Sequence, residues 1–222
     1  MKKIAVIVAG GSGLRMGSDK PKQFLALQHK TILWHSVNAF FKAIPQIEII
    51  LVCPKDFVEE TKMALSDFDS QKIQITIGGA TRFDSVKAGL SCIHDKSVIF
   101  VHDAVRCLVS TDLILRCEGD ALKYGSAIPA ISATDSMRIF QNGKFVPANR
   151  ENIKVIQTPQ VFLSEILLPA YAQEYKESFT DEASVVESAG GEIFLTEGDF
   201  ENIKITRPTD LLLAQKILEH RQ

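Results

Sequence analysis

The sequence lacks the long apolar runs and the excess of positive charge that mark two large classes of protein. None of its apolar stretches approaches the ~18 residues of a membrane-spanning helix, so we expect no membrane partner. The formal net charge of -2 argues against a broad nucleic-acid-binding surface, because such surfaces are basic. Any site for an anionic ligand must therefore be built locally, from a few cations and backbone amides.

Cysteine is also scarce, and no pair has the spacing of a zinc site or of a dense disulfide framework. Cys53, Cys92, Cys107 and Cys117 lie in apolar or helical contexts, which favours buried free thiols in a reducing compartment. The apolar run at 4–9 follows two lysines, as in a signal peptide, but it is short and enters a glycine turn. A buried first strand explains this run better, and we expect a cytoplasmic protein.

What is present fits one globular domain. The 222 residues are 45% hydrophobic and 23% charged, which suits a chain with a substantial core. Short apolar runs alternate with longer helical patterns, as is typical of a parallel sheet covered by helices. We predict strands at 3–9, 47–53, 72–77, 97–102 and 126–131, and helices at 31–43, 56–67, 82–94 and 110–124.

This alternation breaks between residues 135 and 155. Asn142-Gly143 lies there between apolar-alternating segments, and this dipeptide is a strong signal for a β-hairpin. We interpret 135–155 as an arm that projects from the sheet. The chain then returns with a predicted helix at 163–177, a short helix from Asp181, a strand at 192–196 and a closing helix from Pro208. The sequence thus predicts an α/β fold: one Rossmann-like domain over 1–222, with a mostly parallel twisted sheet flanked by helices.

A glycine-rich loop follows the first predicted strand. Its small residues let backbone amides approach a phosphate chain, and consecutive amides form an anion-binding nest. These small residues are Ala9, Gly10, Gly11 and Gly13. The loop is neither a Walker motif nor a dinucleotide fingerprint, which needs glycine where Met16 stands, and alone it could be a tight connection. Arg15 and Lys22 favour a triphosphate site, because cations stabilise the charge of the transition state.

The segment Gly10-Gly11-Ser12-Gly13-Leu14-Arg15-Met16-Gly17, with Pro21-Lys22-Gln23 after it, resembles the signature loop of sugar-nucleotide pyrophosphorylases and related transferases. The Pro-Lys-Gln form resembles the cytidylyltransferases, above all the 2-C-methyl-D-erythritol 4-phosphate cytidylyltransferase family of the non-mevalonate isoprenoid pathway. Matching motifs run in the family's order from Ala9 to Asp210. The resemblance implies an enzyme that joins CTP and 2-C-methyl-D-erythritol 4-phosphate into 4-diphosphocytidyl-2-C-methyl-D-erythritol and pyrophosphate.

The resemblance places the cytosine against the turn after the third predicted strand, which on its own is typical of an ordinary capped strand-to-helix connection. In the family, the backbone near Gly79 and the hydroxyl of Ser85 contact the base, and Arg82 supports the loop. Asp103 and Ala104 complete the predicted CTP site, at the strand end where α/β sheets bind ligands. Asp103 also suits Mg²⁺, the expected cofactor, although an Asp that caps a loop would look the same in sequence.

The resemblance further implies the residues that hold the acceptor, a small polyol phosphate. Lys204 matches a lysine that positions the acceptor phosphate, and we predict that it stands in a strand of alternating isoleucines. Arg106, Ser136 and Thr180 are the other implied acceptor contacts within the subunit. Arg150 matches an arginine that reaches from one subunit's arm into its partner's site, which implies a homodimer with arm exchange. By itself, an arginine on a hairpin is usually a solvated charge.

The implied chemistry is in-line attack of the acceptor phosphate on the α-phosphorus of CTP. Arg15, Lys22, Arg150 and Lys204 are the candidate catalytic cations. A phosphate monoester is already ionised near neutral pH, with a second pKa of about 6, so no general base is required. We therefore expect His102 to be a packed residue at a strand end.

Two alternatives remain open. Val105 and Cys107 depart from the alanine and proline usual in the family, and Val105 is typical of pentitol-phosphate enzymes such as ribitol 5-phosphate cytidylyltransferases. The second alternative, from another class, is a nucleotide-sensing module on the same fold. Such a module would be expected to lack Lys22 or Asp103, and both are present.

Overall fold

The computed structural model describes residues 1–10 and 20–221. Its main sheet has eight strands in the order β10-β7-β11-β6-β1-β4-β5, and β12 pairs with β7. These strands are β1 (Lys2–Val8), β4 (Glu48–Cys53), β5 (Ile73–Ile77), β6 (Ser97–Asp103), β7 (Ser126–Ser132), β10 (Lys154–Ile156), β11 (Gln160–Leu163) and β12 (Leu195–Glu197). The predicted Gly11, Gly13 and Arg15 lie outside the described residues.

Four neighbouring strands in this sheet run parallel, and β12 also pairs in parallel with β7, which confirms the mostly parallel α/β sheet that the sequence predicts. β1 pairs in parallel with both β4 and β6, and β4 pairs in parallel with β5. The register places Val8, the last residue of β1, opposite Val52 and Asp103. Because parallel strands end at the same edge, the segments after β1, β4, β5 and β6 meet there.

Helices cover both faces of the sheet. One core cluster joins it to α1 (Ile32–Ala43), α2 (Val58–Ala64) and α4 (Thr111–Tyr124). A second cluster on the other face joins it to α3 (Arg82–Leu90), α5 (Ser164–Ala170) and α6 (Glu182–Ser188). Short 3-10 turns lie at η2 (Lys22–Phe24), η3 (Lys55–Phe57), η4 (Ser70–Lys72) and η5 (Arg150–Asn152).

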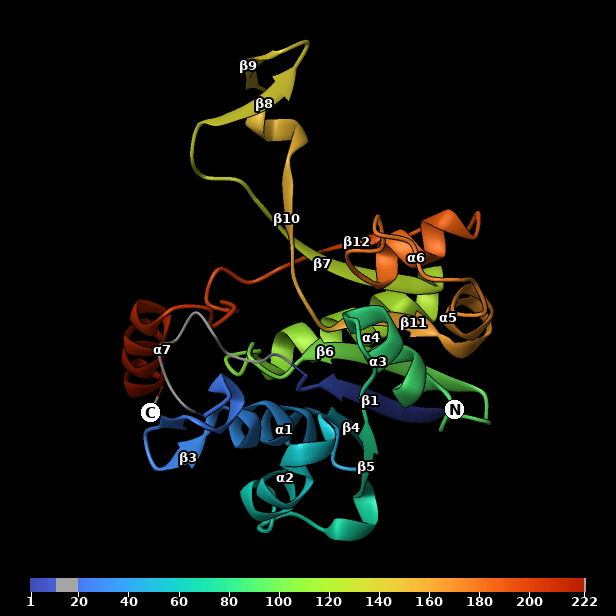
Figure 1. Cartoon of the computed structure of the whole chain (residues 1–222), viewed down its shortest axis with the longest axis vertical. Helices are drawn as coiled ribbons and strands as arrows, with labels where there is room; N and C mark the ends of the chain where they lie inside the picture. The colour runs from blue at the N-terminus through green and yellow to red at the C-terminus, as the bar shows by residue number, and fades with distance from the viewer. Residues whose placement is uncertain (11–19, 222) are drawn as a thin grey trace.

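A third, smaller cluster packs α7 (Pro208–His220) against the small hairpin of β2 (Ala26–Leu27) and β3 (Lys30–Thr31). Ile205, which precedes α7, is fully buried in this cluster. Figure 1 shows α7, in red, on the side of the molecule opposite α5 and α6. The closing helix begins at Pro208, as the sequence predicts, because a first-turn residue needs no amide proton.

The predicted arm is an antiparallel hairpin of β8 (Met137–Gln141) and β9 (Lys144–Ala148), and Figure 1 shows it standing away from the sheet. Asn142 and Gly143 form its turn with φ of 50° and 79°, the left-handed values that a two-residue hairpin turn requires. Phe140 and Phe145 pair across the strands with ring centroids 5.2 Å apart. Both rings are mostly exposed.

Several predicted elements differ from the structure. The helices predicted at 56–67 and 82–94 are shorter, as α2 (Val58–Ala64) and α3 (Arg82–Leu90). The helix predicted at 163–177 is α5, which ends at Ala170 and holds Pro169 in its last turn, where the missing amide proton removes the bond to the Glu165 carbonyl and weakens that turn. The strand predicted at 192–196 is β12, shifted to Leu195–Glu197. Lys204 does not stand in a strand: residues 202–206 are irregular, and Ile205 makes one backbone bond, from its amide to the Val105 carbonyl at 3.0 Å.

All four cysteines are free thiols, as expected. Burial raises the pKa of the Cys107 and Cys117 thiols to about 12. Across residues 1–10 and 20–221, no helix has both the length and the apolar character that crossing a membrane would require.

Candidate nucleotide-binding site

The carboxyl ends of the parallel strands enclose a cavity of about 320 Å³. Among the described residues, it is lined by Val8, Ala9, Gly10, Lys22, Gln23, Gly79, Ala80, Thr81, Arg82, Ser85, Asp103, Val105 and Lys204. Most of the predicted CTP-binding residues that the structure describes are therefore brought together here. A cavity at this edge is where open α/β sheets bind ligands.

The first wall is the start of the glycine loop. The Ala9 amide donates to the Val52 carbonyl at 2.8 Å, and the buried Gln23 side chain donates to the Ala9 carbonyl at 2.7 Å. Among the described residues, a Cβ atom at Gly10 would have only the Ser85 hydroxyl within 4 Å, at 3.8 Å, and Gly10 lines the cavity. The loop therefore leaves the strand with its first peptide fixed and its next residue facing the cavity.

The opposite wall is the turn between β5 and α3. A Cβ atom at Gly79 would lie 2.3 Å from the Cβ of Asp84, so only glycine permits this approach. Thr81 caps α3 in a reciprocal capping box with Asp84. The Ser85 hydroxyl accepts from the Gly79 amide at 3.2 Å and donates to the Thr81 carbonyl at 2.9 Å. The turn is a capped connection, and its Gly79 and Ser85 also line the cavity.

Asp103 is the centre of charge in the site. Its carboxylate accepts from Arg82 Nε at 3.2 Å and from Lys204 Nζ at 2.8 Å. Burial alone would raise the pKa of this carboxyl, but the positive charges of Arg82 and Lys204 outweigh burial and hold the pKa well below its usual range. Asp103 is therefore ionised throughout the physiological range.

The side chain of Arg82 is held in place by Glu182, a residue that the sequence analysis did not identify. Its Nη1 and Nη2 atoms donate to the two carboxylate oxygens of Glu182, at 2.6 and 3.1 Å. Glu182 is fully buried and also accepts from the Tyr171 hydroxyl at 3.1 Å. In sequence, Glu182 reads as an ordinary acid in the first turn of a helix, and no spacing links it to Arg82, a hundred residues earlier.

The cavity as a whole favours an anion. Three of the described lining residues are cationic, Lys22, Arg82 and Lys204, against the single carboxylate of Asp103. Lys22 lies in η2 and is only 8% exposed, so its side chain belongs to the cavity wall rather than to the solvent. This is the local cationic site that a chain of negative net charge needs in order to bind a polyphosphate.

The donor set for a divalent metal is small. Asp103 is the one carboxylate among the described residues that line the cavity, and residues 1–10 and 20–221 contain no group of three or more potential metal-binding side chains. A single carboxylate fits Mg²⁺, which is usually held by one or two carboxylates together with substrate phosphates and water. It does not fit a metal that the protein alone must hold.

His102 and Arg106 flank Asp103 but face other groups. His102 is fully buried between the Thr158 hydroxyl and the Arg106 carbonyl, and burial lowers its pKa to about 3, as expected for a packed residue. Arg106 donates to the backbone carbonyls of Asn202 at 2.8 Å and Ile156 at 3.2 Å. The structure thus places the guanidinium of Arg106 in a structural clamp, outside the described cavity lining.

The other predicted acceptor contacts lie apart from the cavity. Arg150 is exposed at the base of the arm, where its guanidinium donates to the Thr134 carbonyl at 2.9 Å. Ser136 is exposed next to β8, and Thr180 is exposed just before α6, where its amide donates to the Ser184 hydroxyl at 3.1 Å. Within one chain, only Lys204 among the predicted acceptor residues lines the cavity.

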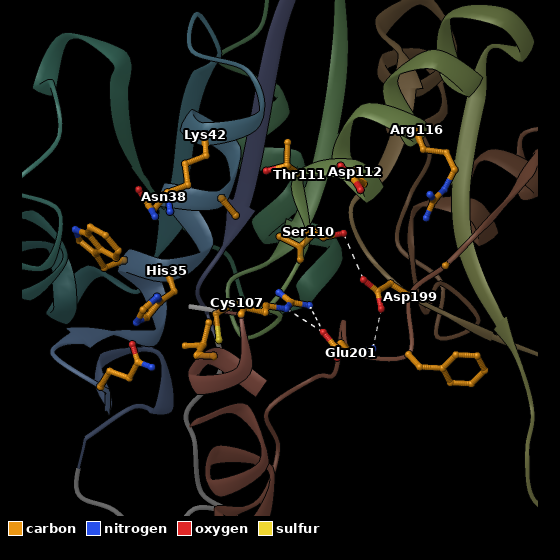
Figure 2. A pocket seen from close by; sticks show the side chains of 18 residues that line it. His35, Asn38, Lys42, Cys107, Ser110, Thr111, Asp112, Arg116, Asp199 and Glu201 are labelled. Atoms are coloured by element: carbon orange, nitrogen blue, oxygen red, sulfur yellow. Dashed lines mark hydrogen bonds and ion pairs between the residues drawn. The ribbon is translucent and has the colours of Figure 1, made fainter. Parts of the chain in front are cut away.

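A larger cavity of about 800 Å³ lies between α1, the start of α4 and residues 198–201 (Figure 2). Its charges are mostly satisfied internally: Ser110 donates to Asp199 at 3.3 Å, and Arg221 pairs with Glu201 at 2.7 Å. Gly198 and the segment after β12 line it, whereas the segments after β1 and β5 line the smaller cavity. Although this cavity is larger, the smaller one has the chemistry of a nucleotide site.

Comparison with known proteins agrees with this geometry. The sequence profile of the family described as 2-C-methyl-D-erythritol 4-phosphate cytidylyltransferase matches residues 3–220. The chain belongs to this family. A family member of that name from Bacteroides thetaiotaomicron is 42% identical over 98% of this chain and 100% of its own length.

Solved cytidylyltransferase structures share the fold. The 4-diphosphocytidyl-2C-methyl-D-erythritol synthase of Anaerococcus prevotii superposes with a TM-score of 0.84 at 29% identity, covering 98% of this chain and 99% of its own. The 2-C-methyl-D-erythritol 4-phosphate cytidylyltransferase of Francisella tularensis gives a TM-score of 0.81 at 30% identity, covering 97% and 99%. The Rossmann-like nucleotidyltransferase fold predicted from the sequence is therefore confirmed.

Proposed function

We propose that this cytidylyltransferase family member joins CTP and 2-C-methyl-D-erythritol 4-phosphate, giving 4-diphosphocytidyl-2-C-methyl-D-erythritol and pyrophosphate in isoprenoid precursor biosynthesis. The observation that carries the proposal is the convergence of Lys22, Lys204 and Asp103 with the Gly79 turn on one cavity. The family's full-length match supports the choice of substrates. The four buried or half-buried free thiols are consistent with a cytoplasmic setting.

The proposed step is a single displacement. An oxygen of the acceptor phosphate forms a bond to the α-phosphorus of CTP, and the bond from that phosphorus to the bridging oxygen of the β-phosphate breaks. Pyrophosphate leaves with the electron pair of that bond. No proton must be removed from the nucleophile, because the phosphate is ionised near neutral pH, which agrees with the neutral, buried state of His102.

The cationic side chains of the site have different proposed roles. Lys22, together with Arg15, is proposed to stabilise the charge that builds up on the α-phosphorus and the departing pyrophosphate. Lys204 lies on the opposite side of Asp103 from Arg82 and is proposed to hold the acceptor phosphate, which is positional catalysis. The small residues of the 78–81 turn and the Ser85 hydroxyl would receive the cytosine.

Asp103 is proposed to hold Mg²⁺ together with the phosphates of CTP. The chemistry that Mg²⁺ would supply there is positive charge, which offsets part of the charge of the phosphates. The support for the proposal is the composition of the site: one ionised carboxylate among cations, at a strand end, with no competing acid in the described lining. Lys204 would then exchange its contact with Asp103 for one with the acceptor phosphate.

The arm is proposed to pair two chains into a homodimer, so that Arg150 of one subunit completes the acceptor site of the other. Two observations support this. The arm carries exposed apolar side chains, with Phe140 64% and Phe145 66% exposed. An isolated two-stranded hairpin is only marginally stable in water, so it needs a surface to pack on. Within one chain, Arg150 is not among the residues that line the cavity.

The proposal is tested by incubating the protein with CTP, Mg²⁺ and one acceptor at a time, with pyrophosphate release as the readout. We expect release with 2-C-methyl-D-erythritol 4-phosphate and little with ribitol 5-phosphate. The second acceptor is included because Val105, the residue shared with pentitol-phosphate enzymes, lines the cavity. Faster turnover with ribitol 5-phosphate would reassign the acceptor, and no release with either would refute the function.

The base is tested in the same assay by replacing CTP. We expect CTP to be preferred over ATP and UTP at subsaturating concentrations, because the small residues of the turn and the Ser85 hydroxyl define one compact wall. Equal rates with all three triphosphates would contradict the proposed base pocket.

A further inference from the structure

The side chain of Lys204 depends on a segment that has no regular structure. The strap (residues 198–206) connects β12 to the N-terminal region of α7. Lys204 Nζ nevertheless lies 2.8 Å from Asp103, although its side chain is 43% exposed and receives little support from packing. Something other than secondary structure must therefore fix the backbone of the strap.

The inner anchor of the strap is the side chain of Gln157. Its Nε2 atom donates to the Asp199 carbonyl at 2.8 Å, and its Oε1 atom accepts from the Asp199 amide at 3.1 Å. One side-chain amide thus satisfies both backbone groups of Asp199, as a neighbouring strand would. The backbone amide of Gln157 donates to the Pro129 carbonyl in β7 at 2.8 Å, so Gln157 is itself attached to the sheet.

The close approach of strap and anchor depends on Gly198. A Cβ atom there would lie 2.7 Å from Gln157 Oε1 and 3.0 Å from the backbone of Ala130. Because Gly198 has no side chain, its amide can donate to the Ala130 carbonyl at 2.9 Å. The first residue of the strap is therefore in close contact with both the sheet and Gln157.

Asn202 fixes the backbone of the strap at a second point, closer to Lys204. It is fully buried, its side chain donates to the Thr158 carbonyl at 2.9 Å, and its own carbonyl accepts from Arg106 at 2.8 Å. Its backbone amide donates to the Asp199 carbonyl at 3.0 Å, the same carbonyl that Gln157 holds. On the other side of Lys204, the Ile205 amide bonds to the Val105 carbonyl, so that Lys204 lies between two fixed points.

The outer contacts of the strap are weaker. Figure 2 shows the Ser110 side chain directed at Asp199. Glu201 is another of the residues that line the larger cavity. The Ser110 contact is 3.3 Å long, and Glu201 is 54% exposed where it pairs with Arg221. Gln157 is 3% exposed, so its hydrogen bonds are shielded from water and their loss is costly.

We propose that Gln157 is a positioning residue for Lys204: it fixes the strap at Asp199 and thereby places the Lys204 ammonium beside Asp103. Gln157 is not among the described residues that line the nucleotide cavity, so it acts through the strap without touching substrate. The proposal rests on the proposed function for its kinetic consequences and on geometry alone for its structural ones.

The kinetic test is a double-mutant cycle between Gln157→Met and Lys204→Ala, with Gln173→Met as the matched control. Gln173 also donates through Nε2 to two backbone carbonyls, at 2.9 and 3.0 Å, but these lie at Ala170 and Val185, away from the strap. We expect Gln157→Met to lower kcat/KM for the acceptor by about 10²-fold, since a displacement of about 1 Å can have that effect. The control should change it by less than about twofold.

In the Lys204→Ala background, Gln157→Met should have almost no further effect, because the group that it positions is already gone. The same fold-loss in both backgrounds would overturn the proposal and leave Gln157 a purely structural role. Should Gln157→Met fold poorly, Gln157→Asn serves instead: it keeps a neutral amide but shortens the side chain by one methylene, so its bonds to Asp199 are weakened, and it should give an intermediate loss that again vanishes without Lys204.

A crystal structure of the Gln157→Met variant separates this proposal from the proposed function. We expect Asp103 and Arg82 to keep their places while Lys204 Nζ leaves its 2.8 Å contact with Asp103. An unmoved Lys204 would overturn the positioning role, whatever reaction the enzyme performs. A wild-type protein inactive with both acceptors would refute the proposed function and leave this structural test intact.

Discussion

The carboxyl edge of the sheet and the arm differ in how completely one chain builds them. At the sheet edge, Lys22 and Asp103 are 8% and 9% exposed, and Asp103 is held by two cations. On the arm, Arg150 is exposed and makes one backbone contact, and Phe140 and Phe145 face solvent. The comparison teaches that one folded chain prepares the nucleotide half of the proposed site, whereas the acceptor half is the part that we propose a second chain completes.

The largest loss of activity should come from a substitution in the nucleotide half of the site. Lys22→Ala should lower kcat by about 10²-fold or more, because the loss of one preorganised donor to the transition state costs about 3 kcal/mol. Steady-state kinetics with CTP varied provide the measurement, and Arg15→Ala should behave alike.

Lys42→Ala is the matched control, because Lys42 is an exposed lysine that lines the larger cavity. A change confined to the KM for CTP in Lys22→Ala would instead indicate uniform substrate binding.

Mixing two inactive variants tests whether the halves belong to different subunits. Arg150→Ala and Lys22→Ala homodimers should each be nearly inactive, but a mixed dimer contains one site with both defects and one with neither. With random exchange at equal amounts, about half of the dimers are mixed, which gives roughly a quarter of wild-type activity by the reciprocity of a two-fold interface. If activity does not recover although mass spectrometry shows that the subunits have exchanged, the proposed division of the site between two subunits is wrong.

Asp103→Asn should impair catalysis mainly through the metal. The asparagine loses the charge that Arg82 and Lys204 hold, so we expect weaker Mg²⁺ binding and partial recovery of activity at high Mg²⁺. The measurement is kcat/KM against Mg²⁺ concentration for both proteins. An unchanged metal dependence would give Asp103 a structural role as the partner of two cations.

The smallest effect on activity concerns the buried imidazole beside the site, whose titration should instead change the stability of the fold. Burial lowers the pKa of His102 to about 3, so the folded protein excludes a proton that the unfolded chain binds. This contribution to stability is complete above the unfolded pKa of about 6.5 and is lost as the pH falls from there toward 3, by about 1.4 kcal/mol per pH unit. His102→Gln should flatten that part of the pH dependence in urea unfolding.

The exposed His94→Gln is the control for this measurement. In activity assays, the rate should show no ionisation of His102 between pH 6.5 and 8. An equally steep acid dependence in His102→Gln would assign the instability to other groups.

Sequence patterns predicted the parallel half of the sheet well, because apolar runs such as 47–53 are long and are bounded by helices with clear periodicity. They failed where long-range contacts decide. β11 is short and is held between β6 and β7 by pairing that no local pattern reveals. Lys204 follows the alternation of a strand, yet no strand of the described residues pairs with 202–206. Side chains such as Gln157 satisfy the backbone of the strap instead.

The residues of the site also differ in how far the sequence could predict them. Gly79, Ser85 and Asp103 were predicted from the family resemblance, and the structure places all three in the lining of one cavity. Glu182 was missed because its role arises only when α6 packs beside α3, which brings it to Arg82. Arg106 matches a family position, but its guanidinium lies in a clamp between two backbone carbonyls, a direction that the sequence does not specify.

The burial of the cysteines makes this protein convenient for site-directed labelling. Alkylation requires a thiolate, and burial raises the pKa of Cys53, Cys107 and Cys117, the last two to about 12. Cys92 is half-buried and is the native thiol to replace. A cysteine introduced at Asn142, on the tip of the arm, would then be the one reactive position for a spin label or fluorophore. Distances between two such labels would report directly on where the arms of a pair of chains lie.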